Sequence, residues 1–353
     1  MLNRLRGFKK LSDIALNISQ GVIPGSDKIY YLEVIEEQGD KILVKNQLDD
    51  NKFLIEKNIT KSIIKGNNIK RYALPTSDYV IIYPYTFLNN EQKLLSLKEL
   101  EQNYPLAFNY LSMHKEFLIN LRKKYKTNPL EWYGFHRARE MRFLEVDKLI
   151  TSHTSISPSF TYAKGSNYFN QNVYGIEIKK EISLIQILGI LNSKLSDFYI
   201  RNTSSMINGG YFLYKTDYIS NLPIITKEKS QLISLTKNAL ELNSKLSNHN
   251  ERFLKYLSRS YRIEKFSKKL ENWYELDFGG FIKELNKAIK KFGGEKLSKS
   301  DEIEWMEIFD DKKNEAFNLI KQISEVEREI DQMVYELYGL TEEEINIVEI
   351  ATA

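Results

Sequence analysis

The stretch KEFLINLRKKYKTNPLEWYGFHRAREMR, residues 115–142, divides at Pro129 into a helical half and a loop half. In the first half Leu118 and Leu121 recur at the spacing of one helix face, with basic residues on the other faces. Proline disfavours the helical conformation of the residue before it, so we expect the helix to end there. The stretch holds eight Lys/Arg against three Glu, and its second half mixes cations with aromatic rings.

Two interpretations of this stretch are open. Cations can neutralise phosphates, arginine can bind the edge of guanine, and flat rings such as Trp132 and Tyr133 can stack on unpaired bases. Alternatively, the helix has a solvated basic face and the rings anchor the loop in the core. The rest of the chain has to decide between a nucleic-acid surface and an ordinary amphipathic segment.

Length and composition indicate a folded protein in a reducing compartment. The 353 residues can form two domains, and 42% hydrophobic with 28% charged residues is ordinary for a globular chain. The absence of cysteine excludes disulfides and thiolate metal sites. The four histidines lack metal-ligand spacing, and no apolar run is long enough to span a bilayer. We therefore expect a cytoplasmic protein with no metal site and no membrane partner.

The basic residues are concentrated in the first part of the chain. Residues 1–222 hold 30 Lys/Arg and 22 Asp/Glu, a balance of +8, whereas residues 223–353 hold 21 and 25, a balance of −4. A moderate local excess of cations favours a polyanion as the partner of the first part.

Local patterns before residue 223 alternate between strands and helices. Alternating apolar residues, turn signals and helical periodicity predict short strands over 11–72 and 79–85, a helical region over 89–126 with a break at Pro105, strands over 149–178 and a buried helix over 183–199. The predicted fold class is α+β, with a mixed, strand-rich domain over residues 1–223 and flanking helices.

The tail after Pro223 has a different pattern. Residues 228–262 mostly follow a heptad seam, and residues 312–338 keep the same apolar spacing. Two such helices joined by a long excursion most simply pair antiparallel. The predicted second domain, residues 224–353, is therefore a coiled-coil-like helical spacer.

Motifs for catalysis and for cofactor binding are missing. The sequence has no P-loop, no glycine-rich methyltransferase loop after a first strand and no Asn/Asp-Pro-Pro-aromatic loop. A metal-dependent nuclease needs two acids and a lysine around a cation, for which Asp147 and Glu177-Ile178-Lys179 are the nearest candidates. Such triplets are frequent by chance, so we expect no catalytic residues and no cofactor-binding residues in this chain.

The order of several short motifs resembles a known family. The motifs are Gln20-Gly21 and Pro24-Gly25, Gly66 with Ile69-Lys70-Arg71-Tyr72, Tyr104-Pro105-Leu106, Leu121-Arg122, Trp132-Tyr133, Arg137 with Arg139, Ile190–Leu195, Gly209-Gly210-Tyr211 with Tyr214, and Leu222-Pro223-Ile224. In this order they resemble the TaqI-like C-terminal specificity domain of type IIG restriction-modification enzymes and related adenine-specific DNA methyltransferases. The specificity subunits of type I systems are similar more loosely.

The resemblance implies a target recognition domain that binds double-stranded DNA. The tail helices would act as a spacer and would dock a methyltransferase/endonuclease subunit or domain through residues 228–262 and 312–338. S-adenosylmethionine and Mg²⁺ would then be bound only by that partner or by an upstream catalytic domain. Fused members of the family carry catalytic domains upstream, so both a separate specificity subunit and a piece of a larger enzyme stay open.

Residue chemistry then divides the candidate DNA contacts. Arg122, Lys123, Lys124 and Lys126 are predicted to hold phosphates, and Arg137, Arg139 and Arg142 are predicted to bind base edges or phosphates. Further candidates in loops are Lys70, Arg71, Lys164, Lys215 and the Asn208-Gly209-Gly210 turn, whose backbone could approach DNA closely. We expect Trp132 and Tyr133 to be core anchors, because a duplex offers few unpaired bases. The alternatives are an unrecognised nuclease or methyltransferase site, or a nucleic-acid-binding adaptor.

Overall fold

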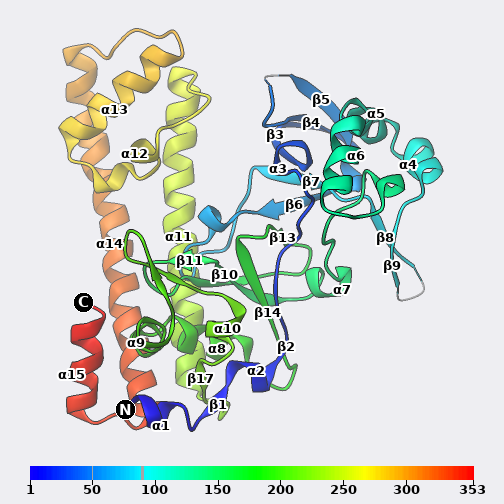
Figure 1. Cartoon of the computed structure of the whole chain (residues 1–353). Coiled ribbons are helices and arrows are strands. Elements are labelled where there is room, and N and C mark those ends of the chain that lie inside the picture. The colour runs from blue at the N-terminus through cyan, green and yellow to red at the C-terminus, as the bar shows by residue number, and fades with distance from the viewer. Residues whose placement is uncertain (50, 89–90) are drawn as a thin grey trace. The chain divides into compact units, whose positions relative to one another are not determined.

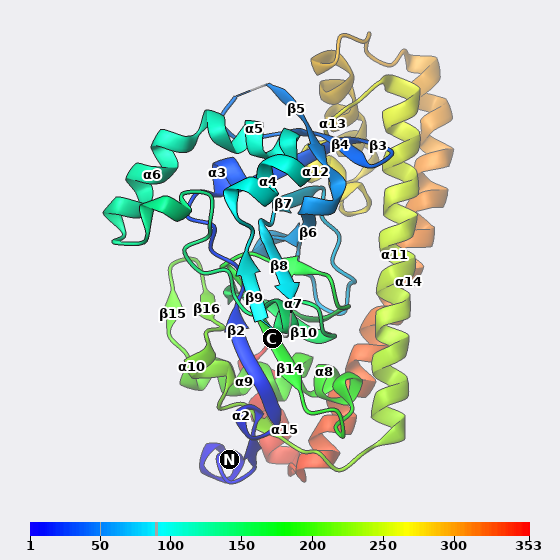
Figure 2. The same ribbon diagram turned by 90° about the vertical axis from the view of Figure 1, so that its right-hand side faces the viewer.

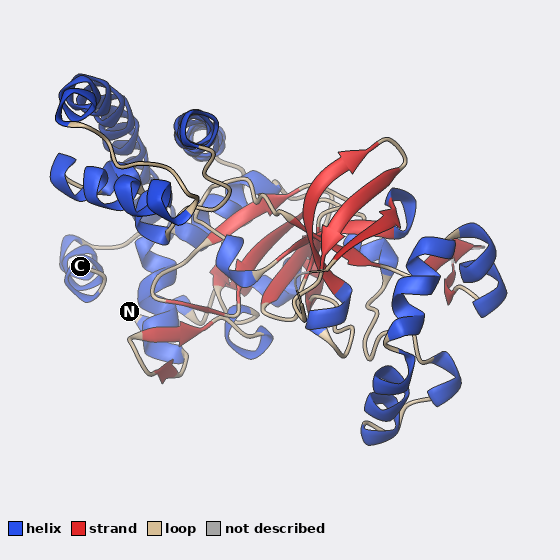
Figure 3. Ribbon diagram, turned by 90° about the horizontal axis from the view of Figure 1, so that it is seen from above, coloured by secondary structure: helices blue, strands red, loops and turns tan. Residues whose placement is uncertain are grey.

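The computed structural model of the protein describes residues 1–49, 51–88 and 91–353. The predicted turn at Asp50 and the predicted start of a helix at Asn89 lie outside the described residues. The chain forms two compact units, residues 1–228 with 335–353 and residues 229–334. All described strands belong to the first unit, and the fold class is α+β as predicted. Figure 3 draws these strands in red.

The largest sheet has six strands within the described residues. Their order is β13 (Tyr168–Phe169), β6 (Thr60–Ile64), β7 (Tyr79–Ile82), β3 (Tyr31–Gln38), β4 (Lys41–Lys45) and β5 (Lys52–Glu56). Strands β3, β4 and β5 form an antiparallel meander, in which Val34 pairs with Val44 and Val44 with Phe53. Along β4 buried residues alternate with partly exposed ones, which is the period of a strand with one face in the core.

A second sheet lies at the centre of the first unit. Its order is β12 (Phe160–Ala163), β10 (Lys148–Ser152), β14 (Val173–Ile178) and β2 (Ala15–Gln20), all antiparallel. Every residue of β14 is buried, so this strand is covered on both faces. Figure 2 shows β2 and β14 running side by side.

Three smaller sheets complete the strands of the described chain. Strands β11 (Thr154–Ser155), β16 (Tyr211–Leu213) and β15 (Met206–Ile207) form one of them. The others are the pairs β1 (Lys9–Lys10) with β17 (Pro223–Ile224), and β8 (Tyr85–Leu88) with β9 (Glu91–Leu94).

The predicted helical region 89–126 begins later than expected. Residues 91–94 form β9, because Leu94 pairs with Tyr85 and both side chains pack on the core. Three helices follow, α4 (Leu97–Asn103), α5 (Pro105–Met113) and α6 (Lys115–Lys124). The hydroxyl of Ser96 caps α4, and Pro105 occupies the first turn of α5, where a missing N–H costs nothing.

The predicted buried helix over 183–199 is two helices, α8 (Leu184–Asn192) and α9 (Lys194–Thr203). They separate at Ser193, whose hydroxyl accepts from the backbone N–H of Ser196 and caps α9. The shorter helices of this unit are α1 (Leu2–Leu5), α2 (Leu11–Ile14), α3 (Asp27–Tyr30), α7 (Met141–Leu144) and α10 (Thr216–Ile219), with the 3-10 turns η1 (Lys57–Ile59), η2 (Gly66–Asn68) and η3 (Pro129–Glu131).

The C-terminal helix α15 (Glu342–Ala351) packs within the first unit. Its Glu349 forms an ion pair with Lys194 of α9, and Tyr335 donates to the same carboxylate at 2.8 Å. The hydroxyl of Tyr338 donates to the carbonyl of Pro223 at 2.7 Å. The C-terminal end of the predicted tail domain therefore packs with the strand-bearing part of the chain.

The second unit consists of helices. Helix α11 (Ser230–Tyr261) agrees with the predicted helix over 228–262, and α14 (Lys299–Tyr338) supplies the second long helix. His249 contacts Lys312 and Tyr261 contacts Trp305, so the two helices run antiparallel as predicted (Figure 1). Between them lie α12 (Lys268–Glu271), the 3-10 turn η4 (Trp273–Glu275) and α13 (Phe278–Lys291). Phe253 of α11 and Phe309 of α14 pack against the buried Trp273 of η4.

In the described part of the chain, no helix is both long and apolar enough to cross a membrane.

Candidate nucleic-acid interface

The lysines at the end of α6 stand in solvent. Lys123, Lys124 and Lys126 are exposed, whereas Leu118 on the opposite face is buried in the core. None of these three lysines forms an ion pair with another described residue, so their charges are available to a polyanion. Lys126 has a positive φ of 54°, which turns the chain away from the helix axis.

Arg122 is placed differently from its neighbours, and its predicted phosphate contact needs correction. Its side chain is 7% exposed, and its Nε and Nη1 donate to the carbonyls of Asn128 and Gly134 at 2.6 and 2.7 Å. Its Nη2 lies 3.5 Å from the carboxylate of Glu131. The guanidinium is used inside the chain to clamp the loop that follows α6, because Arg122 lies on the helix face that packs inward.

The aromatic residues of the loop are core anchors, as predicted. Trp132 and Tyr133 are 3% and 4% exposed. The hydroxyl of Tyr133 donates to the carbonyl of Leu95 at 2.6 Å, and Tyr30 donates to the carbonyl of Tyr133 at 2.8 Å. These rings are not available for stacking on a base.

The loop then pairs with the turn near residue 23. The backbones of Ile23 and Arg137 exchange two hydrogen bonds of 2.9 and 3.1 Å, and Arg139 Nε donates to the carbonyl of Gly21 at 3.1 Å. Arg137 is exposed, whereas Arg139 is half-buried in a left-handed conformation with φ of 64°. Burial, together with the neighbouring charge of Arg137, lowers the pKa of Arg139. The turn at residues 21–23 thus holds the loop that carries Arg137 and Arg139, and these two cations lie close to each other.

The remaining candidate cations are scattered. Arg142 is exposed and lies 3.8 Å from Glu177, and Lys70 and Lys164 are exposed. Lys164 lies near Asp147, just before β10, and Lys215 lies near His153, just after β10. The two lysines therefore lie at opposite ends of that strand. Arg71 lies half-buried near Asp197, whose pKa is raised by burial and lowered in part by Arg201 and Arg71.

The predicted glycine turn connects β15 to β16. Asn208, Gly209 and Gly210 are all exposed, and the two glycines have φ of 85° and 77°. No atom lies within 4 Å of the position that a Cβ on Gly210 would take, so the backbone at this tip is open to a partner.

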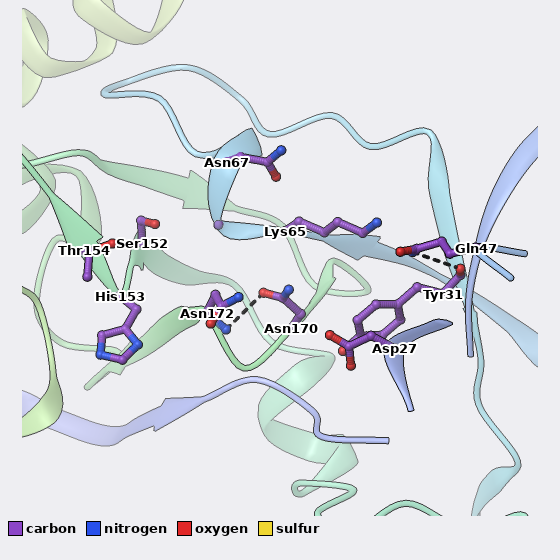
Figure 4. A pocket seen from close by; sticks show the side chains of 11 residues that line it. Asp27, Tyr31, Gln47, Lys65, Asn67, Ser152, His153, Thr154, Asn170 and Asn172 are labelled. Carbon is purple, nitrogen blue, oxygen red and sulfur yellow. Dashed lines mark hydrogen bonds between the residues drawn. The ribbon is translucent and has the colours of Figure 1, made fainter. Parts of the chain in front are cut away.

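A polar cleft that the sequence did not predict lies between the two large sheets of the first unit. We call it the amide-lined cleft; its volume is about 540 Å³, and its polar wall includes Gln47, Lys65, Asn67, Ser152, Asn170 and Asn172. Figure 4 shows side chains from the turn η2 and from the β13–β14 connection on its two sides. These residues come from separate segments, and only the loop after Lys65 carried a polar signal in the sequence.

A second pocket brings together the residues of the nuclease alternative. Asp147, Glu177 and Lys179 line one space of about 500 Å³. Two of these groups have other partners, because Asp147 accepts from Tyr162 and Gly165, and Lys179 donates to the carbonyl of Asp13. The buried Oε2 of Glu177 has no hydrogen-bond partner among the described residues and lies 3.8 Å from Arg142. Among the described residues, no group of three or more His, Cys, Asp or Glu side chains is arranged to hold a metal ion.

Two family models match successive parts of the chain. Residues 61–224 match the TaqI-like C-terminal specificity domain, and residues 225–334 match a domain of unknown function (DUF8810). The type II restriction enzyme and methyltransferase RM.Eco57I of Escherichia coli is 23% identical over 226 residues, which cover 60% of this chain. The chain spans 22% of the length of that relative.

Among solved structures, the type IIL restriction-modification enzyme MmeI in complex with DNA aligns with a TM-score of 0.43 and 13% identity. The alignment covers 88% of this chain and 36% of that one. The turn at Gly21 lies before the residues that the specificity-domain family matches, although its backbone pairs with them. Residues 61–224 are therefore similar to the TaqI-like C-terminal specificity domain, and a type II restriction enzyme and methyltransferase is among the relatives of the chain.

Proposed function

We propose that this chain recognises a specific double-stranded DNA sequence and directs a methyltransferase/endonuclease core to it, without a catalytic site of its own. The observation that carries the proposal is the specificity domain in residues 61–224. The excess of cations before residue 223 supports a DNA partner for this part of the chain. A cytoplasmic location is part of the same proposal.

The exposed cations would have two kinds of role. Lys123, Lys124 and Lys126 have no acidic partner among the described residues, so they suit contacts to phosphates, which are independent of sequence. Arg137 is exposed beside the half-buried Arg139, and a guanidinium at this place suits a base edge or a phosphate. Lys70, Arg142, Lys164, Lys215 and the Asn208–Gly210 turn stay as further candidates.

Methylation and cleavage would be done by a partner subunit or domain. Adenine methylation requires the base to leave the stack, so the partner would hold the flipped base and bind S-adenosylmethionine and Mg²⁺ while this chain holds the register. We propose that the outer faces of residues 228–262 and 312–338 dock that partner. Tyr256 and Phe317, at 54% and 63% exposure, are apolar groups on these two helices that suit such a contact.

A selection experiment tests the proposed function. The whole chain is incubated with duplexes that contain a randomised core, and retained duplexes are sequenced and compared with scrambled ones in mobility shifts. We expect one enriched motif. Arg137→Ala should lower the discrimination between this motif and scrambled duplexes more than Lys123→Ala does. Retention of duplexes without any enriched motif, or no retention at all, would contradict a specificity function.

The pocket of Asp147, Glu177 and Lys179 favours a nuclease as the second candidate function. The chain alone is incubated with plasmid DNA and Mg²⁺, and a parallel reaction contains S-adenosylmethionine. Nicking by the wild type that Glu177→Gln abolishes would support this candidate. Intact, unmethylated plasmid in both reactions would leave the recognition module as the better account.

A further inference from the structure

The amide-lined cleft is held in a fixed shape by backbone hydrogen bonds. Asn170 N–H donates to the carbonyl of Ile64 at 3.0 Å, and His153 N–H donates to the carbonyl of Asn172 at 2.7 Å. A Cβ on Gly66 would lie 3.0 Å from both the Asn172 carbonyl and the Ser152 hydroxyl. Turn η2, strand β10 and the β13–β14 connection are therefore packed closely together, so the polar groups around the cleft are preorganised.

The cleft holds more donors and acceptors than the chain itself uses. The side-chain amides of Asn67 and Asn172 are exposed, and neither has a hydrogen-bond partner among the described residues. The dashed line at Asn172 in Figure 4 is its backbone N–H donating to Asn170 Oδ1. The hydroxyls of Ser152 and Thr154 are likewise unpaired within the described chain. The buried Nε2 of His153 also has no partner there. Unpaired polar groups in a rigid wall indicate a ligand that supplies hydrogen bonds.

The charges of the cleft do not suit a phosphate. Asp27 and Lys65 lie on the same wall, where burial raises the pKa of the carboxyl and lowers the pKa of the ammonium, and each charge opposes the effect of burial on the other. The two charges offset each other. Lys65 Nζ also lies 3.1 Å from the centre of the Tyr79 ring and covers that face.

The tyrosine rings near the cleft are not placed to stack on a base. Tyr31 is 1% exposed, and Lys65 covers one face of Tyr79, so neither of these two tyrosine rings is open to an extrahelical base. The groups that remain are amides and hydroxyls. Asparagine and glutamine pair with the N6 and N7 edge of adenine in the major groove, and serine and threonine bind any base edge.

The cleft is connected to the candidate cations by one short segment. Val22 forms a β-bridge with Asn170 on the cleft floor, and the next residue, Ile23, forms one with Arg137. Gly21 N–H donates to the carbonyl of Val173 at 3.1 Å, and its own carbonyl accepts from Arg139. Residues 21–23 thus hold the amides and the cations in a fixed relation, as a reader of duplex DNA requires.

We propose that the amide-lined cleft binds base edges of a stacked duplex, with Asn67 and Asn172 as specificity-determining residues and an adenine-containing pair as the preferred ligand. This inference rests on the proposed function and deepens it. On this proposal, the residues that recognise the base sequence differ from the lysines that contact the phosphates of the DNA.

The test compares single variants in the randomised-duplex selection. Asn67→Ala and Asn172→Ala are each compared with Asn58→Ala, an exposed asparagine on η1 outside the cleft. We expect each cleft variant to lose the base preference at one or two positions of the wild-type motif. Affinity for the wild-type motif should fall roughly 5- to 150-fold. The dependence of affinity on salt should stay unchanged, because no phosphate contact is removed.

Each outcome distinguishes the two proposals. An enriched wild-type motif that both cleft variants retain in full, with unchanged affinity, would overturn the cleft inference and leave the proposed function standing. Equal weakening on all sequences would also overturn it, because that is the behaviour of a phosphate contact. A wild type without any enriched motif would remove the proposed function, and the inference with it.

Discussion

The lysines at the end of α6 and the amide-lined cleft belong to the same compact unit, yet they are opposite kinds of surface. Lys123, Lys124 and Lys126 come from one continuous segment and carry charge in open solvent. The cleft is assembled from segments that are more than a hundred residues apart, and its charges offset each other. The first surface suits recognition of a ligand by its negative charge alone, and the second suits recognition by the pattern of its hydrogen-bonding groups. Affinity and specificity can therefore be altered separately.

Within the first surface, the strongest contrast is between two neighbouring cations. Arg122→Ala should lower the free energy of unfolding by roughly 3–4 kcal/mol, because two charge-assisted hydrogen bonds to the loop are lost and a buried carbonyl is left unpaired. Lys123→Ala, one residue along, is the matched control and should change it by less than about 0.5 kcal/mol. Urea denaturation of both variants measures the difference. Equal stability of the two would show that Arg122 does not clamp the loop.

The segment that joins the amide-lined cleft to Arg137 and Arg139 should be the next most sensitive. Gly21→Ala should cost roughly 2–3 kcal/mol of unfolding free energy, because its Cβ would lie 1.9 Å from the backbone oxygen of Phe169. Gly279→Ala, where the nearest atom is 4.0 Å away, should be neutral or slightly stabilising. Denaturation curves measure both. A stable Gly21→Ala protein that still discriminates sequences would break the proposed link between cleft and cations.

The strand behind the cleft contains a buried lysine whose titration can be measured. Burial lowers the pKa of Lys148 to about 8 from 10.5. Between these values the unfolded chain binds more protons than the folded one, so the free energy of unfolding should rise by about 2 kcal/mol from pH 8 to pH 10. Urea denaturation at several pH values measures this slope. Lys148→Met should remove that part of the rise, whereas the exposed Lys180→Met should keep it.

The smallest effects on stability belong to the exposed lysines, where the effect on DNA is the informative one. Lys123→Ala, Lys124→Ala and Lys126→Ala should each change the free energy of unfolding by less than about 0.5 kcal/mol. Each should lower the slope of log affinity against log salt by about one on specific and scrambled duplexes alike. Mobility shifts at several salt concentrations measure the slope. A selective loss on one sequence would assign that lysine to base reading.

Much of the fold could be predicted from local patterns. The heptad seam predicted α11 and its antiparallel partner, because a helix of that length must bury one face along its whole length. Short strands were predicted over residues 11–72, and three of them, β3, β4 and β5, pair as an antiparallel meander. The order of short motifs pointed to the specificity domain that the family match of residues 61–224 then showed.

Other assignments required knowledge of which side chains face inward. Arg122 and Lys123 have equal charge and adjacent positions, and only the packing of α6 against the loop places one in the core and the other in solvent. Residues 91–94 fall within the region predicted to be helical, but their pairing with residues 85–88 makes them a strand. Local propensity is weak compared with the burial that tertiary contacts provide.

By itself, the sequence determined the α+β class, the long helices of the tail and the excess of cations before residue 223. These are properties of neighbouring residues, and periodicity or counting reveals them. Only the tertiary structure joined Val22 to Asn170, Ile23 to Arg137 and Gly66 to Asn172, and with them formed the amide-lined cleft. A site built from amides of distant segments has no signature in the sequence. Asparagine is common in turns for conformational reasons, so its presence in a loop does not reveal a binding role.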